Sequence, residues 1–158
     1  MSMKVRRHVQ GNAYAELAVP VPTSMTAAGL HRAIHSDRFL KPVASCSQAL
    51  QRGSMLLITG QLPVDTVTHL KLGDGVITLE SRQVMRNPQA VPEEVGVGCE
   101  HLVSATVYLT DIDTLDNFDA IWQGYCPDPQ ADPSRTVVQV AALVIGIQLE
   151  ISAIAIKD

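Results

Sequence analysis

The stretch Ser134–Ile156 reads SRTVVQVAALVIGIQLEISAIAI and decides the fold. It contains two runs, residues 135–140 and 148–156, that are rich in Val and Ile and in which polar and apolar positions alternate. A period of two residues in such β-branched sequence predicts two strands. A short connection that carries Gly146 joins them. We therefore expect an antiparallel hairpin.

The alternation also assigns side chains to faces of this hairpin. Arg135 and Val137 share a face of the first strand, and Glu150 and Ser152 share a face of the second. Either plausible register places Arg135 opposite Glu150 or Ser152, so Arg135 and Glu150 are predicted to lie close together on one face. Two interpretations stay open. The pair is a cross-strand ion pair of small energetic value, or it is a site where Arg135 grips a carboxylate and Glu150 orients water.

Outward from this stretch, the chain alternates strands and helices. Residues 54–60 and 101–110 are predicted strands, and two amphipathic helices are predicted, one from Thr78 and one over residues 115–125. Pro88 and Pro92 lie inside the first helix, so a kink or a break near Asn87 is expected. This order predicts an α+β fold with both helices on one face of the sheet. The other face then needs a cover, which implies another subunit.

Composition limits the domain organisation. The chain has 158 residues, of which 46% are hydrophobic and 18% are charged, so a single packed domain is expected. Residues 1–36 are rich in Ala, Pro, Ser and Thr and show no sustained period. They are predicted to be an N-terminal extension, with residues 37–158 as the folded domain. The apolar runs are shorter than a membrane helix requires, and a cytoplasmic protein is expected, although the acid-poor extension leaves organelle targeting open.

The charge is unevenly distributed. The formal net charge is −4, but residues 1–52 carry seven basic and two acidic side chains, whereas residues 53–158 carry five basic and fourteen acidic ones. An acidic body repels phosphate backbones, which makes a nucleic acid an improbable partner. Three cysteines, Cys46, Cys99 and Cys126, show no CxxC spacing. We expect free thiols rather than a disulfide scaffold, and no zinc ribbon.

Several segments together resemble one known family. The segments are Ser47–Ala49 (SQA), Thr59–Pro63 (TGQLP), Thr106–Asp111 (TVYLTD), Ser134–Val140 (SRTVVQV) and Leu149–Ile156 (LEISAIAI). In this order they resemble the Rid family, also called YjgF-type or L-PSP proteins, over about residues 42–156. The resemblance implies a chorismate-mutase-like (Bacillus type) α+β fold, a homotrimer with clefts between subunits, and no metal or organic cofactor.

The resemblance also implies an activity and its residues. Typical members hydrolyse small 2-enamino or 2-imino acids to 2-keto acids and ammonia. Arg135 matches the arginine that holds the substrate carboxylate, Glu150 the acid that helps to position water, and Gly60 a glycine that lines the cleft. Cys46 and Val137 stand where the family often has an aromatic residue and a Cys or Thr, so both are expected to line an altered pocket. The alternatives are a non-catalytic module that binds a small carboxylate or a protein partner, and, less favoured, the endoribonuclease or translation-inhibitor activity attached to the family's name.

Overall fold

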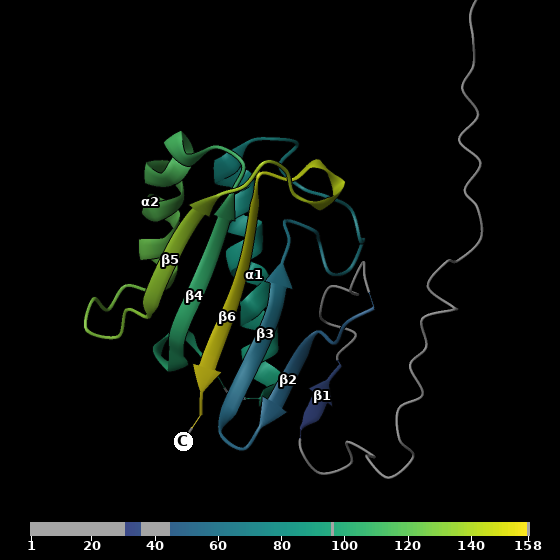
Figure 1. The fold of residues 1–158 in the computed structure, drawn as a ribbon, viewed down its shortest axis with the longest axis vertical. Coiled ribbons are helices and arrows are strands. Elements are labelled where there is room, and N and C mark those ends of the chain that lie inside the picture. Colours follow the sequence, from purple (N-terminus) through teal and green to yellow (C-terminus); the bar gives the residue numbers. More distant parts are fainter. Residues whose placement is uncertain (1–30, 36–44, 96, 158) are drawn as a thin grey trace, which may run out of the picture.

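The computed structural model describes residues 31–35, 45–95 and 97–157. Its core is one six-stranded sheet in the order β1-β2-β3-β6-β4-β5. The strands are β1 (Arg32–Ile34), β2 (Ala49–Arg52), β3 (Met55–Gln61), β4 (Leu102–Leu109), β5 (Ser134–Gln139) and β6 (Leu149–Ile156). Two helices, α1 (Ile77–Val95) and α2 (Leu115–Tyr125), lie on the same face of this sheet, and no described helix covers the other, open face (Figure 1).

This architecture confirms the α+β fold and the two helices on one face. The four strands expected from the sequence form as β3, β4, β5 and β6, and β1 and β2 add an antiparallel edge beside β3. The β1 strand lies at the end of the segment that was expected to be an extension. Residues 1–30 and residue 36, the rest of that segment, lie outside the described residues. None of the described helices is long and apolar enough to cross a membrane.

The position of β5 corrects the predicted hairpin. β5 pairs in parallel with β4, from Ser104–Ser134 to Leu109–Gln139, and forms an edge of the sheet. β6 lies on the other side of β4 and runs antiparallel to it. The reason is the connection through α2, because a strand, a helix and a following strand form a crossover that returns the chain in the same direction. The hairpin prediction was therefore wrong, although both of its strands exist.

The helices bury their apolar stripes against the sheet. Phe118, Ile121 and Trp122 of α2 are buried as the sequence spacing predicted. They share one cluster with apolar residues of α1, β4 and β6, which are Ile77, Val84, Met85, Ala105, Val107, Leu109, Leu149 and Ile151. Phe118, Val107, Leu109 and Leu149 are each 0% exposed. This cluster fixes α2 over β4 and β5.

The helix α1 runs without interruption through Pro88 and Pro92. The expected break near Asn87 does not occur. Asn87 instead anchors the helix to the chain that precedes it, since its Nδ2 donates to the carbonyl oxygens of Leu62 and Val64, at 2.7 and 3.0 Å. The free energy gained from these tertiary hydrogen bonds offsets the cost of the helical hydrogen bonds that interior prolines remove.

The cysteines also differ from the expectation. Cys99, just before β4, and Cys126, at the end of α2, are joined by a disulfide with a Cα–Cα distance of 5.7 Å. The prediction of free thiols therefore holds for Cys46 and is wrong for the other two. Their separation of 27 residues carried no pairing signal. The fold brings them within the normal range for a disulfide because α2 ends beside the segment that precedes β4.

A buried carboxylate ties two loops to α1. Glu80, at 0% exposure, accepts hydrogen bonds from the backbone N–H of Gly75 at 3.1 Å and of Gln148 at 2.7 Å. Gly73 makes room for it, because a Cβ there would lie 2.6 Å from the Glu80 Cγ. Since Gln148 immediately precedes β6, Glu80 sets where this strand begins.

We expect Glu80→Ala to lower the free energy of unfolding by about 3 kcal/mol, because two buried amide donors would lose a charged acceptor. Leu79→Ala is the matched control on the same helical turn. Leu79 is 53% exposed, so its truncation is expected to cost no more than about 0.5 kcal/mol. Urea denaturation measures both. Equal effects of the two variants would contradict the role given to Glu80.

Candidate functional site

Arg135 lies on the edge strand β5 and faces the helices. It is in register with Ala105 of β4, which in turn is in register with Ala153 of β6. Residues in register across a sheet point to the same face, and Ala105 belongs to the core beneath the helices. The Arg135 side chain therefore extends from the sheet edge towards α2, and its side chain is 24% exposed.

Three residues of α2 surround the guanidinium. Arg135 Nη2 forms an ion pair with Asp119 Oδ1 at 2.9 Å. The guanidinium carbon lies 5.1 Å from the centre of the Trp122 ring and 5.8 Å from that of Phe118. These distances allow a cation–π attraction. Together the three residues hold a long, flexible side chain in one place.

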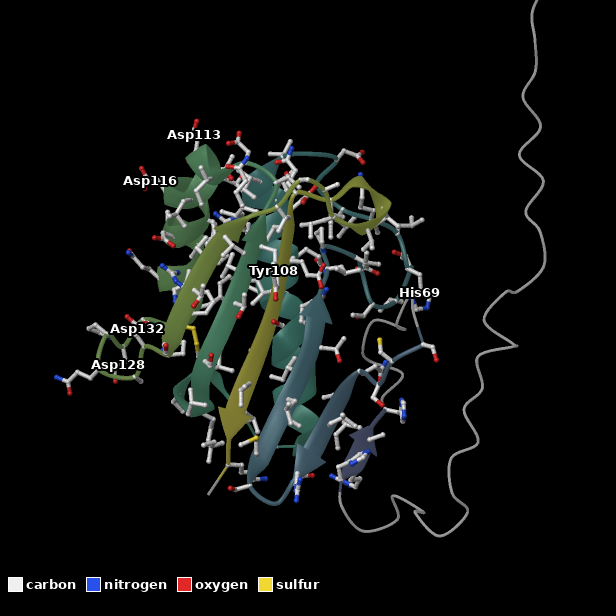
Figure 2. All side chains as sticks on the ribbon, viewed as in Figure 1. His69, Tyr108, Asp113, Asp116, Asp128 and Asp132 are labelled. Atoms are coloured by element: carbon white, nitrogen blue, oxygen red, sulfur yellow. A yellow bond between two sulfur atoms is a disulfide. The ribbon has the colours of Figure 1, made fainter. Side chains whose placement is uncertain are left out.

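A small polar cavity of about 330 Å³ opens at this arginine. Its lining combines α2 with the loop before β5, through Asp119, Trp122, Gln123, Asp132, Pro133 and Arg135. Figure 2 shows Asp132 and Asp128 on this loop and Asp116 and Asp113 beside α2, so acidic side chains gather around this end of the molecule. The cavity thus presents one cation within acidic surroundings.

Glu150 lies on the opposite, open face. It is in register with Tyr108 of β4, which points away from the helices (Figure 2). Its carboxylate lies directly over Gly60 of β3, where a Cβ would overlap Glu150 Oε1. Burial raises the pKa of Glu150 above its ordinary value of 4.5. A raised pKa makes this carboxylate a better proton acceptor than an ordinary glutamate.

Arg135 and Glu150 are therefore not neighbours within one chain. The strand β4 separates β5 from β6, and the two side chains point to opposite faces. The prediction that both lie close together on one face was wrong, because it assumed direct pairing of β5 with β6. Gly60 and Glu150, by contrast, lie in contact on the open face.

The remaining candidate residues occupy different places. Val137 is half-buried and packs against the core beneath the helices, two residues along the strand from Arg135. Cys46 is exposed and is the free cysteine of the described chain. Its neighbour Ser47 accepts a hydrogen bond from Thr59 Oγ1 at 2.6 Å, next to Gly60. Cys46 thus lies near the Gly60 and Glu150 side of the molecule, and Val137 near the Arg135 side.

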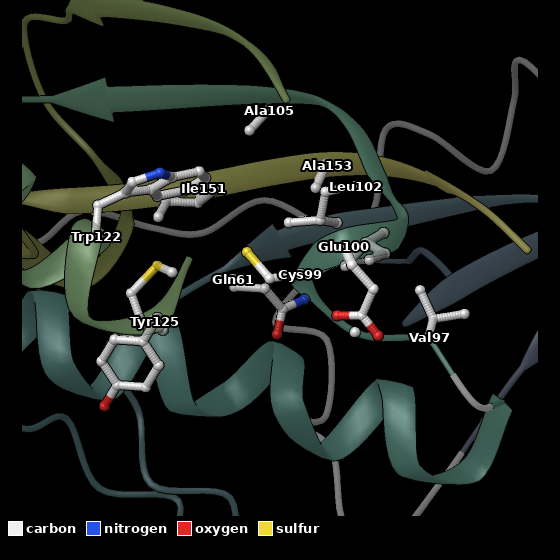
Figure 3. A pocket seen from close by; sticks show the side chains of 13 residues that line it. Gln61, Val97, Cys99, Glu100, Leu102, Ala105, Trp122, Tyr125, Ile151 and Ala153 are labelled. Carbon is white, nitrogen blue, oxygen red and sulfur yellow. The ribbon is translucent and has the colours of Figure 1, made fainter. Parts of the chain in front are cut away.

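A second, larger cavity of about 400 Å³ lies between the sheet and the helices. Figure 3 shows Ile151, Ala153, Leu102 and Trp122 among its lining residues. The lining is mostly apolar, and Gln61 uses its amide to bond the Thr59 carbonyl at 2.6 Å. This cavity offers no cationic group for a carboxylate. Among the described residues, no group of three or more His, Cys, Asp and Glu side chains could hold a metal ion.

The sequence alone does not identify Asp119 as a site residue. The sequence does indicate its position on the helix, because Asp119 follows the buried Phe118 and precedes the buried Trp122 by about one turn. Residues three and four apart share a side of a helix, so its place beside Trp122 could have been anticipated. Its pairing with Arg135 could not, because that depends on parallel pairing of β4 and β5.

We expect Gly60→Ala to return the pKa of Glu150 towards its ordinary value, since the new methyl group would push the carboxylate out towards water. Gly124→Ala is the matched control, because a Cβ at Gly124 meets no atom within 4 Å. Carbon-13 NMR titration of the labelled glutamate carboxyl groups measures the shift. An unchanged pKa of Glu150 in Gly60→Ala would contradict the contact.

Comparison with known proteins shows the family of this chain. Residues 36–157 match the protein family described as endoribonuclease L-PSP. The protein DfrA of Myxococcus xanthus is 35% identical over 80% of this chain and 95% of its own.

Solved structures are similar as well. The crystal structure of RidA from an Antarctic Psychrobacter superposes with a TM-score of 0.74 at 31% identity, covering 80% of this chain and 99% of its own. The crystal structure of E. coli TdcF with bound serine superposes with a TM-score of 0.73 at 27% identity, over 80% of this chain and 99% of its own. The chain therefore belongs to the endoribonuclease L-PSP family, the YjgF/Rid family.

Proposed function

We propose that this protein hydrolyses small 2-enamino and 2-imino acids to 2-keto acids and ammonia. The observation that carries the proposal is Arg135, a guanidinium held by an ion pair and two aromatic rings at the mouth of a small polar cavity. A planar guanidinium suits the bidentate binding of a carboxylate. The cavity volume of about 330 Å³ suits a small substrate.

The chemistry needs little beyond positioning. An enamine is converted to its imine tautomer by protonation at carbon, and the imine carbon is already electrophilic. Water adds to this carbon, the new C–O bond forms, and the C–N bond then breaks to release ammonia and leave the ketone. Glu150 would take the proton from water and return it to the departing nitrogen, for which its raised pKa is suited. Holding water and imine together supplies most of the rate gain.

Both groups can act on one substrate if the site is shared between copies of the chain. Within one chain Arg135 and Glu150 lie on opposite faces. The open face exposes large apolar side chains, namely Met55, Leu57, Val138 and Ile156. Such a surface favours association.

We propose a homotrimer in which the open face is covered and Arg135 of one copy approaches Glu150 of another. Analytical ultracentrifugation should then give the mass of three chains.

Two relatives support the substrate class. The Psychrobacter protein carries the name RidA, and E. coli TdcF was crystallised with serine, a small molecule with a carboxylate next to an amine. A small carboxylate ligand beside Arg135 is consistent with both.

A non-catalytic binding module is the second candidate. The separation of Arg135 from Glu150 within one chain favours it, since a chain that failed to assemble would bind a carboxylate at Arg135 without Glu150. Ribonuclease activity is less favoured. The six acidic residues between Asp111 and Asp132, with no Lys or Arg from residue 87 to residue 134, repel a polyanion.

We expect Arg135→Ala to lower kcat/KM for freshly generated 2-aminoacrylate on the order of 100-fold, because the substrate loses its anchor. Ammonia release measures the rate. Arg86→Ala is the matched control, since Arg86 is an exposed arginine of α1, and it should leave the rate unchanged. In the parent protein, the rate should fall as the pH drops through the raised pKa of Glu150, above the range of an ordinary glutamate.

The absence of any rate enhancement with 2-aminoacrylate or longer imino acids would overturn the enzymatic proposal. Carboxylate binding that required Arg135 but gave no turnover would support the binding module instead. Ribonucleolytic activity that survived Arg135→Ala unchanged would point to a contaminant.

A further inference from the structure

The cavity beside Arg135 is not a simple anion site. Its lining carries one guanidinium and two carboxylates, Asp119 and Asp132. The surrounding helix and loop add Asp111, Asp113, Asp116 and Asp128. A simple monoanion approaching Arg135 meets more negative than positive charge.

Two atoms in this cavity are shielded from water and lack hydrogen bonds to the described residues. They are Arg135 Nη1, a donor, and Asp119 Oδ1, an acceptor. The 2.9 Å contact between Arg135 Nη2 and Asp119 Oδ1 is an ion pair without an aligned hydrogen bond. Buried polar atoms normally have hydrogen-bond partners. Arg135 Nη1 has none among the described residues, and Asp119 Oδ1 is held by the ion pair alone.

We propose that Asp119 is a specificity-determining residue that makes the site select zwitterions, small molecules that carry a cationic nitrogen next to a carboxylate. The ligand carboxylate binds Arg135, and the protonated imine or amine nitrogen of the ligand binds Asp119. In an α-imino or α-amino acid these charges are one carbon atom apart, which matches two opposite charges in direct contact. The proposal rests on the proposed function in that it uses the same Arg135.

A ligand bound between Asp119 and Arg135 replaces the ion pair that joins them. A ligand that separates the pair must offer a partner to each member, because a partly buried charge without a partner is costly. A zwitterion provides both partners. A 2-oxo acid provides only the carboxylate and leaves Asp119 unpaired, so it binds more weakly. Hydrolysis of an imino acid removes its cationic nitrogen, and the 2-keto acid product is then released.

The experiment compares ligands with one carbon skeleton. L-alanine and D-alanine are the zwitterions, pyruvate is the monoanion and isopropylamine is the monocation. Binding is followed by the fluorescence of Trp122, the single tryptophan of the chain, whose ring lies 5.1 Å from the guanidinium carbon. Calorimetry on the parent protein checks each affinity. We expect at least one alanine enantiomer to bind about tenfold or more tightly than either pyruvate or isopropylamine.

Variants separate Asp119 from the general acidity of the region. Asp119→Asn should abolish the preference for alanine over pyruvate, and Asp119→Glu, which keeps the charge, should retain much of it. Asp116→Asn is the matched control, because it removes the same charge from an exposed position of α2 outside the cavity lining. It should change the preference by no more than about twofold.

Equal binding of pyruvate and alanine by the parent protein would overturn the proposal without any variant. Tight binding of isopropylamine would show a cation site instead, and an equal effect of Asp116→Asn and Asp119→Asn would show only long-range charge. These results are independent of turnover. Failure of the proposed hydrolysis leaves the zwitterion preference measurable, and loss of the preference leaves hydrolysis measurable.

Discussion

The parallel pairing of β4 with β5 is the constraint on which the rest of the structure depends. The connection from β4 to β5 passes through α2, and a crossover of this kind returns the chain in the same direction beside the strand it left. β6 is then placed on the other side of β4, between β4 and β3. The core follows from this order, because Phe118 and Trp122 of α2 can then pack over β4 and β5.

The same pairing separates the two groups that the proposed hydrolysis requires. Arg135 points beneath α2, where Asp119 and two aromatic rings hold it, and Glu150 points to the open face over Gly60. Under the proposed function, each face of one chain carries half of a site. Association through the apolar open face would join the halves, and it would also cover the exposed Leu57 and Val138. Assembly and the proposed activity would then depend on the same interface.

Much of the fold could be predicted from the sequence, because periodicity reports local structure directly. The strands β3 to β6 and the buried stripe of α2 follow from spacing alone, and Arg135, Glu150 and Gly60 followed from the family resemblance. What failed depends on contacts between distant segments. The spacing of Arg135 and Glu150 does not reveal that β4 lies between them. Cys99 and Cys126 meet because α2 ends beside the segment that precedes β4. The helix α1 continues through Pro88 because Asn87 anchors it. The role of Asp119 depends on the same strand order.

The most direct test of a shared site is complementation between two inactive variants. Chains that carry Arg135→Ala and chains that carry Glu150→Gln are co-expressed with different affinity tags, and mixed assemblies are purified through both tags. If Arg135 of one copy acts with Glu150 of another, mixed assemblies recover imine hydrolysis that neither variant shows alone, because some sites pair two intact residues. If mixed assemblies form and stay as inactive as each variant alone, the two residues do not act across copies, and the account is wrong.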